Sequence, residues 1–142
     1  MRTLVLDTGA LAAVQRDPVR FLALLDVAAE RNLRLRTTAP VLTEFLGGSP
    51  RSLRARGAYV TSRLRVGAVD EHLARRAALL RQVALDQSAG RTEPSAIDAL
   101  VVADAEVEGG LAVYDGDRAD FEALVRASGE VEAKALTELT KR

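Results

Sequence analysis

The chain contains no cysteine and a single histidine, His72, among its 142 residues. The absence of cysteine excludes a disulfide scaffold, a thiol nucleophile and a thiolate zinc site, and it suits a reducing cytosol. A single histidine excludes a histidine-rich metal site and argues against a histidine relay. Any metal site must therefore be built from oxygen ligands, which favours Mg²⁺ or Mn²⁺.

A net charge and long apolar runs are also missing. The 20 basic and 20 acidic residues balance, so the overall charge does not indicate a nucleic-acid-binding protein. All the bases except Lys134 and Lys141 are arginines, which can grip phosphates, although GC-rich coding enriches arginine too. The opening "MRTLVLDTGAL" is too short and too charged for a signal peptide, and no apolar run approaches membrane length. We expect a cytoplasmic protein with no membrane partner.

The pattern of apolar residues predicts one α/β domain over residues 1–142. Hydrophobic residues make up 48% of the chain, enough for a folded core. Short apolar or alternating runs predict strands, and apolar residues at helical spacing predict helices between them. This alternation is typical of an α/β sandwich with a mainly parallel sheet. The strands are expected at 3–6, 33–38, 111–114 and, at an edge, 131–136; the helices at 8–16, 18–32, 40–46, 50–64, 70–86, 96–108 and 117–128.

Acidic residues stand where such a fold binds ligands, at the carboxyl ends of parallel strands. Asp7 directly follows the first strand, and Asp115 and Asp117 follow the strand at 111–114. Glu44 and Asp98 lie in two helices that are expected to begin near the same sheet edge. Several carboxylates brought together need a counter-cation to stay ionised. One or two Mg²⁺ ions would supply it, and would also activate water and hold a phosphodiester.

Each of these acids also has a purely structural interpretation. Asp7 fits a helix N-cap, and Ser95-x-x-Asp98 fits a capping box. Glu44 fits a solvated position beside an apolar stripe. In "VYDGDRADF" (113–121), Asp120 fits the first turn of a helix, where an acid is favoured by the helix dipole.

The order of the motifs resembles the PIN-domain nucleases, and most closely the VapC-type toxins of bacterial type II toxin–antitoxin pairs. The resemblance rests on "LVLDTGALAA", "APVLTEFLGG" and "AIDALVVADAEVEGGLAVYDGDRADFEAL" and covers nearly the whole chain. On these motifs the family's four acids match Asp7, Glu44, Asp98 and, when "ADF" is aligned, Asp117. The resemblance implies a PIN-like three-layer α/β/α sandwich.

Two positions depart from the family pattern. Gly9 stands where the family often has a hydroxyl residue or Asn, a departure that would loosen a hydrogen bond to the Asp7 carboxylate. Asp115 stands where the family has threonine, which adds a charge that either ligates a metal or water, or raises the pKa of a neighbour. Neither departure removes one of the four expected acids.

The resemblance implies a Mg²⁺-dependent endoribonuclease, with Mn²⁺ as a possible substitute. Asp7, Asp98 and Asp117 would hold the metal, with Asp115 as a further candidate ligand. Glu44 would ligate through water or act as the general base. The metal would activate water for in-line attack on the RNA phosphodiester and stabilise the developing charge.

The resemblance also implies partners. Arg91 and Arg118 are candidates to bind the phosphates of the RNA substrate. A small cognate antitoxin would lay a helix or tail into an apolar groove, with the helix 18–30 and the helix of Val41 and Phe45 as candidate walls, and would be able to place an arginine among the acids. A homodimer is expected, with the helix at 70–86 as the candidate interface.

Three alternatives compete with the nuclease. A haloacid-dehalogenase-like phosphatase needs a second aspartate two places after Asp7, where this chain has Gly9. A receiver domain needs a lysine after a late strand, and Lys134 lies within the expected last strand. A catalytically weak PIN-like module that only binds RNA or protein ranks below the nuclease because all four acids are present.

Overall fold

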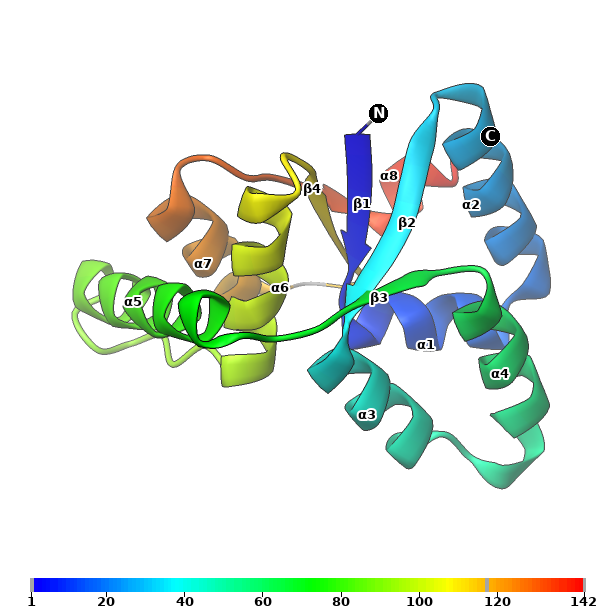
Figure 1. The fold of residues 1–142 in the computed structure, drawn as a ribbon, viewed down its shortest axis with the longest axis horizontal. Helices are drawn as coiled ribbons and strands as arrows, with labels where there is room; N and C mark the ends of the chain where they lie inside the picture. The colour runs from blue at the N-terminus through cyan, green and yellow to red at the C-terminus, as the bar shows by residue number, and fades with distance from the viewer. Residues whose placement is uncertain (1, 117, 142) are drawn as a thin grey trace.

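A sheet of five parallel strands forms the centre of the protein in the computed structural model, which describes residues 2–116 and 118–141 (Figure 1). The strands lie in the order β3-β2-β1-β4-β5, and each neighbouring pair in this part of the chain is parallel. Because β1 and β4 are neighbours, segments from the beginning and the last third of the chain lie side by side within the sheet. The strands are β1 (Arg2–Leu6), β2 (Leu33–Thr38), β3 (Arg65–Gly67), β4 (Leu111–Tyr114) and β5 (Glu132–Ala135).

Helices cover both faces of this sheet (Figure 1). One layer consists of α1 (Thr8–Arg16), α2 (Pro18–Glu30), α3 (Ala39–Gly48), the 3₁₀ turn η1 (Arg51–Leu53) and α4 (Arg54–Ser62). The other consists of α5 (Glu71–Gln87), α6 (Ala96–Val107) and α7 (Ala119–Ser128), and the short α8 (Leu136–Leu139) follows β5. The predicted three-layer α/β/α sandwich is therefore confirmed. None of the helices in the described ranges is long and apolar enough to cross a bilayer.

Aspartates begin three of the helices. The side chains of Asp7, Asp17 and Asp70 each accept a hydrogen bond from the backbone N–H three residues further on, at 2.7, 3.1 and 2.8 Å. These bonds satisfy N–H groups that have no partner within the helix. Pro18 opens α2, where its missing N–H costs nothing. The interpretation of Asp7 as an N-cap is thus correct, but it uses only one of the two carboxylate oxygens.

The structure differs from the sequence prediction between residues 50 and 67. The single helix expected at 50–64 is divided into η1 and α4, and the edge strand β3 follows at once. β3 was missed because three residues that include a glycine carry no strand pattern. Gly67 is required there because the Arg36 side chain lies against it: a Cβ at this position would stand 2.1 Å from the Arg36 Nη2.

The core lies on both faces of the sheet and contains very few charges. β1 contributes Leu4, Val5 and Leu6, each fully buried, and Phe21 and Phe121 are the largest buried side chains of the two helical layers. Two acids in the described part of the chain are buried as whole residues, Asp7 at 0% and Asp104 at 2% exposure. Burying a carboxylate is costly unless it is paired or neutralised. The residues that pair with these two acids therefore show how the fold compensates the cost of burying them.

Candidate functional site

Asp7 lies at the carboxyl end of β1, completely removed from solvent. Its N–H donates to the carbonyl of Val113 in β4 at 3.0 Å, which continues the pairing of the two strands past their last residues. Its Oδ1 accepts the capping bond from Ala10, and its Oδ2 accepts from Arg118 Nη1 at 2.9 Å. Burial raises the pKa of Asp7 to about 6; the bond from Ala10 and the charge of Arg118 oppose this rise.

Asp98 approaches Asp7 from the first turn of α6. Its N–H donates to the Ser95 hydroxyl at 3.0 Å, so the predicted cap is present. Its carboxylate is directed to Arg118, whose Nη2 donates to Oδ2 at 2.5 Å. Capping and site membership are therefore compatible, because they use different atoms of Asp98. Burial raises the pKa of Asp98, and the charge of Glu44 acts in the same direction.

Arg118 connects these two acids. It precedes α7, and its guanidinium donates through one nitrogen to Asp7 and through the other to Asp98. The guanidinium also lies 5.7 Å from the centre of the Phe121 ring, which adds a cation–π contact. The side chain is 28% exposed. One cation therefore joins carboxylates that come from the beginning and from the last third of the chain.

The other predicted site residues differ in how near they lie to the acid pair. Asp115 is half-buried directly after β4, and its charge contributes to the raised pKa of Asp7. Glu44 is exposed on α3 and close enough to act on Asp98. Arg91 is exposed in the loop before α6 and forms no ion pair with the described residues. Asp117, the predicted third ligand, lies outside the described residues.

Within the ranges 2–116 and 118–141, no three histidine, aspartate or glutamate side chains are grouped closely enough to hold one metal ion. What is assembled there is an acid pair, Asp7 and Asp98, with its arginine. The two carboxylates can offer oxygen ligands to one cation, the donor type that Mg²⁺ and Mn²⁺ prefer.

Two threonines that sequence reasoning missed hold the sheet edge beside the site. Thr37 is fully buried in β2, and its hydroxyl donates to the Leu6 carbonyl at 2.8 Å, one residue before Asp7. Thr38 is fully buried too, and its hydroxyl accepts from the Val41 N–H at 3.4 Å to begin α3. The alternation in "LRLRTT" predicts the strand, but nothing in it distinguishes these hydroxyls.

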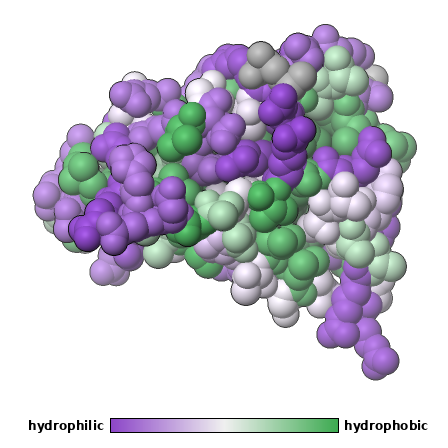
Figure 2. Space-filling model, viewed as in Figure 1, coloured by the Kyte–Doolittle hydropathy of each residue, from purple (hydrophilic) through white to green (hydrophobic). Residues whose placement is uncertain are grey.

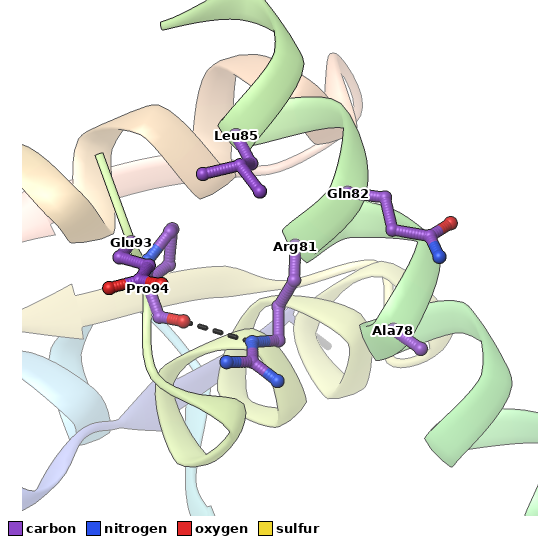
Figure 3. Close-up of a pocket in the computed structure, with 6 residues that line it drawn as sticks. All are labelled: Ala78, Arg81, Gln82, Leu85, Glu93 and Pro94. Carbon is purple, nitrogen blue, oxygen red and sulfur yellow. Dashed lines mark hydrogen bonds between the residues drawn. The ribbon is translucent and has the colours of Figure 1, made fainter. Parts of the chain in front are cut away.

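The start of α6 is supported by α5 (Figure 3). The Arg81 Nε donates to the Pro94 carbonyl at 2.9 Å, one residue before the Ser95 cap. Around this bond is a shallow pocket of about 290 Å³, lined by Ala78, Arg81, Gln82, Leu85, Glu93 and Pro94 (Figure 3). The bond ties down the loop that delivers Asp98 to the acid pair.

A second arginine cluster holds the later part of α6. The Arg36 Nε and Nη2 donate to the two carboxylate oxygens of Asp104 at 2.7 and 3.0 Å, and Nη2 also lies 3.4 Å from Glu108. The hydrogen bonds to Asp104 raise the pKa of Arg36. This cluster connects β2 to α6 and explains how Asp104 is buried as a charge.

A groove runs from the acid side of the molecule between α1 and α3. It has a volume of about 390 Å³. Glu44 and Arg16 place opposite charges along it, and Phe45, 3% exposed, contributes an apolar wall. Thr8 lines the end next to Asp7, and its buried hydroxyl has no partner among the described residues.

The fold belongs to a known structural class. No protein-family model matches the chain, and no similar protein is found among the curated proteins. Solved structures are similar over nearly the full length, and they confirm the PIN-like three-layer α/β/α fold that the sequence predicts.

The structures concerned are toxin–antitoxin complexes. A chain of VapBC2 from Rickettsia felis, bound to a promoter DNA fragment, has a TM-score of 0.74 and 17% identity, covering 94% of this chain and 98% of that one. A chain of DNA-bound VapBC from Salmonella typhimurium has a TM-score of 0.70 and 19% identity, covering 96% and 99%. A chain of FitAB bound to an IR36 DNA fragment has a TM-score of 0.62 and 19% identity, covering 94% of each. At these identities the likeness is one of fold.

Proposed function

We propose that this protein is a metal-dependent endoribonuclease, the toxin of a toxin–antitoxin pair. The observation that carries the proposal is the cation shared by Asp7 and Asp98. These residues come from β1 and α6, yet their carboxylates accept from the same guanidinium at 2.9 and 2.5 Å. One buried and one partly buried acid that face the same positive charge at the carboxyl edge of a parallel sheet are suited to a divalent cation.

The residues have distinct parts in the proposed reaction. Asp7 and Asp98 would hold the metal, with Asp117 and Asp115 as further candidates. A bound Mg²⁺ or Mn²⁺ supplies Lewis acidity at the phosphate and lowers the pKa of a coordinated water. Glu44 is exposed at the groove and close enough to influence Asp98, and it would accept the proton of the attacking water. The assignment of RNA as substrate rests on the resemblance of the motifs to the PIN-domain nucleases.

The groove beside the acids is the proposed path of the substrate. The groove has both polar and apolar walls, so it would take a single strand of RNA. Arg16 would contact a phosphate, and Phe45 a base or ribose. Arg91 is exposed in the loop before α6. It remains a candidate phosphate contact.

The antitoxin is proposed to bind the helical layer formed by α2, α3 and α4. The similar structures are VapBC and FitAB complexes bound to DNA. In this chain the layer exposes Val19, Leu22, Leu46 and Tyr59 at 44% or more. Figure 2 shows hydrophobic residues reaching the surface near the middle of one face, around β3 and α3 of Figure 1. Within α3, the helix expected as a groove wall, Phe45 lines the groove and Val41 is fully buried in the core. A homodimer through α5, where Leu79 is 46% exposed, is a further proposal.

Cleavage of RNA by single-acid variants tests the function. The native protein is expected to cut a single-stranded RNA in Mg²⁺ or Mn²⁺ and to stop when EDTA is added. Asp7→Asn and Asp98→Asn each remove a proposed ligand and should lower the rate by more than about 100-fold. The measurement is the single-turnover cleavage rate of a labelled RNA.

Asp86→Asn makes the same change at an exposed position of α5 and should cut at the native rate. A native rate for Asp98→Asn would mean that this residue only caps α6. Cleavage that survives EDTA would remove the metal from the proposal. Turnover of a phosphomonoester in place of RNA would favour the dehalogenase-like alternative.

A further inference from the structure

Arg118 stands between the two acids that the proposed function assigns to a metal. Its guanidinium gives one hydrogen bond to Asp7, fully buried, and one to Asp98, whose side chain is 15% exposed. A guanidinium normally grips both oxygens of a single carboxylate. Dividing it between two carboxylates places its positive charge in the space between them, where a bridging cation would neutralise both.

The position of Arg118 in α7 does not explain this arrangement. Arg118 is the N-cap residue of α7, and its side chain makes no capping bond. A helix N-terminus carries a partial positive charge, so a cation there is disfavoured by the helix itself. Asp120 and Glu122 in the first turn of α7 suit that end of the helix, and Arg118 does not. The two acids therefore account for the placement of its side chain.

Gly9 lies beside both Asp7 and Arg118. A Cβ at position 9 would lie 3.5 Å from Asp7 Oδ1 and 3.9 Å from Arg118 Nη1, which are ordinary contacts. A longer polar side chain at this position would extend from that point into the surroundings of the acid and the guanidinium. With glycine at position 9, Asp7 has no neighbouring side chain from α1 to stabilise its free oxygen, and Arg118 takes that part.

We propose that Arg118 is a built-in counter-ion of the acid pair, one that competes with the divalent cation for the same two carboxylates. The inference rests on the proposed metal-dependent function. In the metal-free protein, Arg118 gives one hydrogen bond to each of Asp7 and Asp98, partly compensates their charges and stabilises the fold. Metal binding must displace at least one of its two hydrogen bonds. The arginine thus lowers the affinity for metal, and the displaced guanidinium remains beside the site, within reach of a substrate phosphate.

The competition predicts two effects of opposite sign. Arg118→Gln removes the charge, so the metal-free protein should melt at a lower temperature. The same variant should bind Mn²⁺ more tightly, by on the order of tenfold, because no bond to a guanidinium has to be broken first. A residue with only a structural part would lower the melting temperature and leave the Kd for Mn²⁺ unchanged or raise it. Titration calorimetry with Mn²⁺ and melting in EDTA measure the two effects without any substrate.

Three further proteins complete the experiment. Arg126→Gln makes the same substitution on the exposed side of α7 and should match the native protein in both measurements. Arg118→Lys keeps the charge without the fork and should give a Kd between those of the native protein and Arg118→Gln. It also serves if Arg118→Gln does not fold. Asp98→Asn should bind Mn²⁺ weakly whether or not Arg118 is present.

The outcomes separate the inference from the function on which it rests. Tighter binding by Arg118→Gln supports the inference, also when the native protein binds no Mn²⁺ at all. Equal Kd values for native and Arg118→Gln, with binding lost in Asp98→Asn, would overturn the counter-ion and leave the metal site standing. No binding by either protein would overturn both.

Discussion

Two of the arginine clusters on α6, those of Arg36 and Arg118, use the same chemistry in opposite ways. Arg36 gives both of its bonds to the two oxygens of Asp104, at 2.7 and 3.0 Å, and places Glu108 at its edge. The pair is bidentate and closed, and Gly67 packs against it so tightly that no Cβ would fit. Such a pair fastens β2 to α6 and leaves no oxygen of Asp104 in need of another ligand.

The cluster at the beginning of α6 is open by comparison. Arg118 gives one bond to each of two acids, so each carboxylate depends on a second donor or remains partly unsatisfied. Burial raises the pKa of Asp7 to about 6, which shows that one guanidinium and one capping bond do not fully compensate for the loss of water. The difference teaches that a buried arginine–acid contact is structural when its geometry is complete. Such a contact marks a candidate site when it leaves the negative charge of the acids only partly compensated.

The largest effect is expected from breaking the closed cluster. Arg36→Ala would leave Asp104 buried without its partner, and removing one member of a buried ion pair costs about 3–5 kcal/mol of unfolding free energy. Urea unfolding measures it. Replacing Arg36 by Met together with Asp104 by Leu should recover most of the loss, because both charges are removed at once. If the unfolding free energy falls by less than about 1 kcal/mol, the Arg36–Asp104 pair contributes no more than an ordinary surface ion pair.

A smaller effect is expected from the charge of Asp7 in the open cluster. The folded pKa, about 6, is above the ordinary value of 3.8, so the carboxyl group stabilises the fold when protonated. Its contribution is present below about pH 4 and is lost as the pH rises through about 6. Over this window the native protein in EDTA should lose about 3 kcal/mol relative to Asp7→Asn.

Asn is a good N-cap, so Asp7→Asn keeps the start of α1 and removes only the titration. Denaturation of both proteins at pH 4, 5, 6 and 7 gives the difference directly. A difference that does not change with pH would contradict the raised pKa. Asp86→Asn, at an exposed position, should show no such change relative to the native protein.

The smallest effect is expected where α5 supports the open cluster. Arg81→Gln removes the bond to the Pro94 carbonyl, and one such hydrogen bond contributes about 1 kcal/mol. The loosened loop precedes Asp98, so the Kd for Mn²⁺ should rise slightly while the closed cluster at Arg36 is unaffected. Arg75→Gln, on the exposed side of α5, is the matched control. An equal loss of stability in Arg81→Gln and Arg75→Gln would show that Arg81 does not support the site.

Much of the fold was predictable because its signals are local. β2 and β4 and the helix α1 were predicted with the bounds that the structure has, since buried strands and amphipathic helices carry their pattern within a few residues. β3 was missed because it is specified by tertiary contacts. It pairs with β2, and the Arg36 side chain packs on Gly67.

The candidate site was predicted in part for the same reason. Asp7 and Asp98 are marked by their places after a strand and at a helix start, and the structure brings them to one guanidinium. Arg118 was expected to bind phosphate, and its contact with both acids was not foreseen. Nothing local in "DRADF" indicates that its side chain turns toward β1 and α6. The predicted roles of Glu44, Asp115 and Arg91 stay predictions.

The sequence by itself determined the class of fold, the absence of thiol and histidine chemistry, and the acids available for a site, because each follows from residue type and local spacing. The tertiary structure decided which of these acids share a charge. The parallel pairing of β1 with β4 and the antiparallel return of α6 bring distant residues to one edge of the sheet. Electrostatic energy depends on distance and burial, which only the folded chain sets. Nothing in the sequence distinguishes Arg36 from Arg118. In the folded chain, Arg36 forms a closed ion pair that connects β2 to α6, and Arg118 lies in an open candidate metal site.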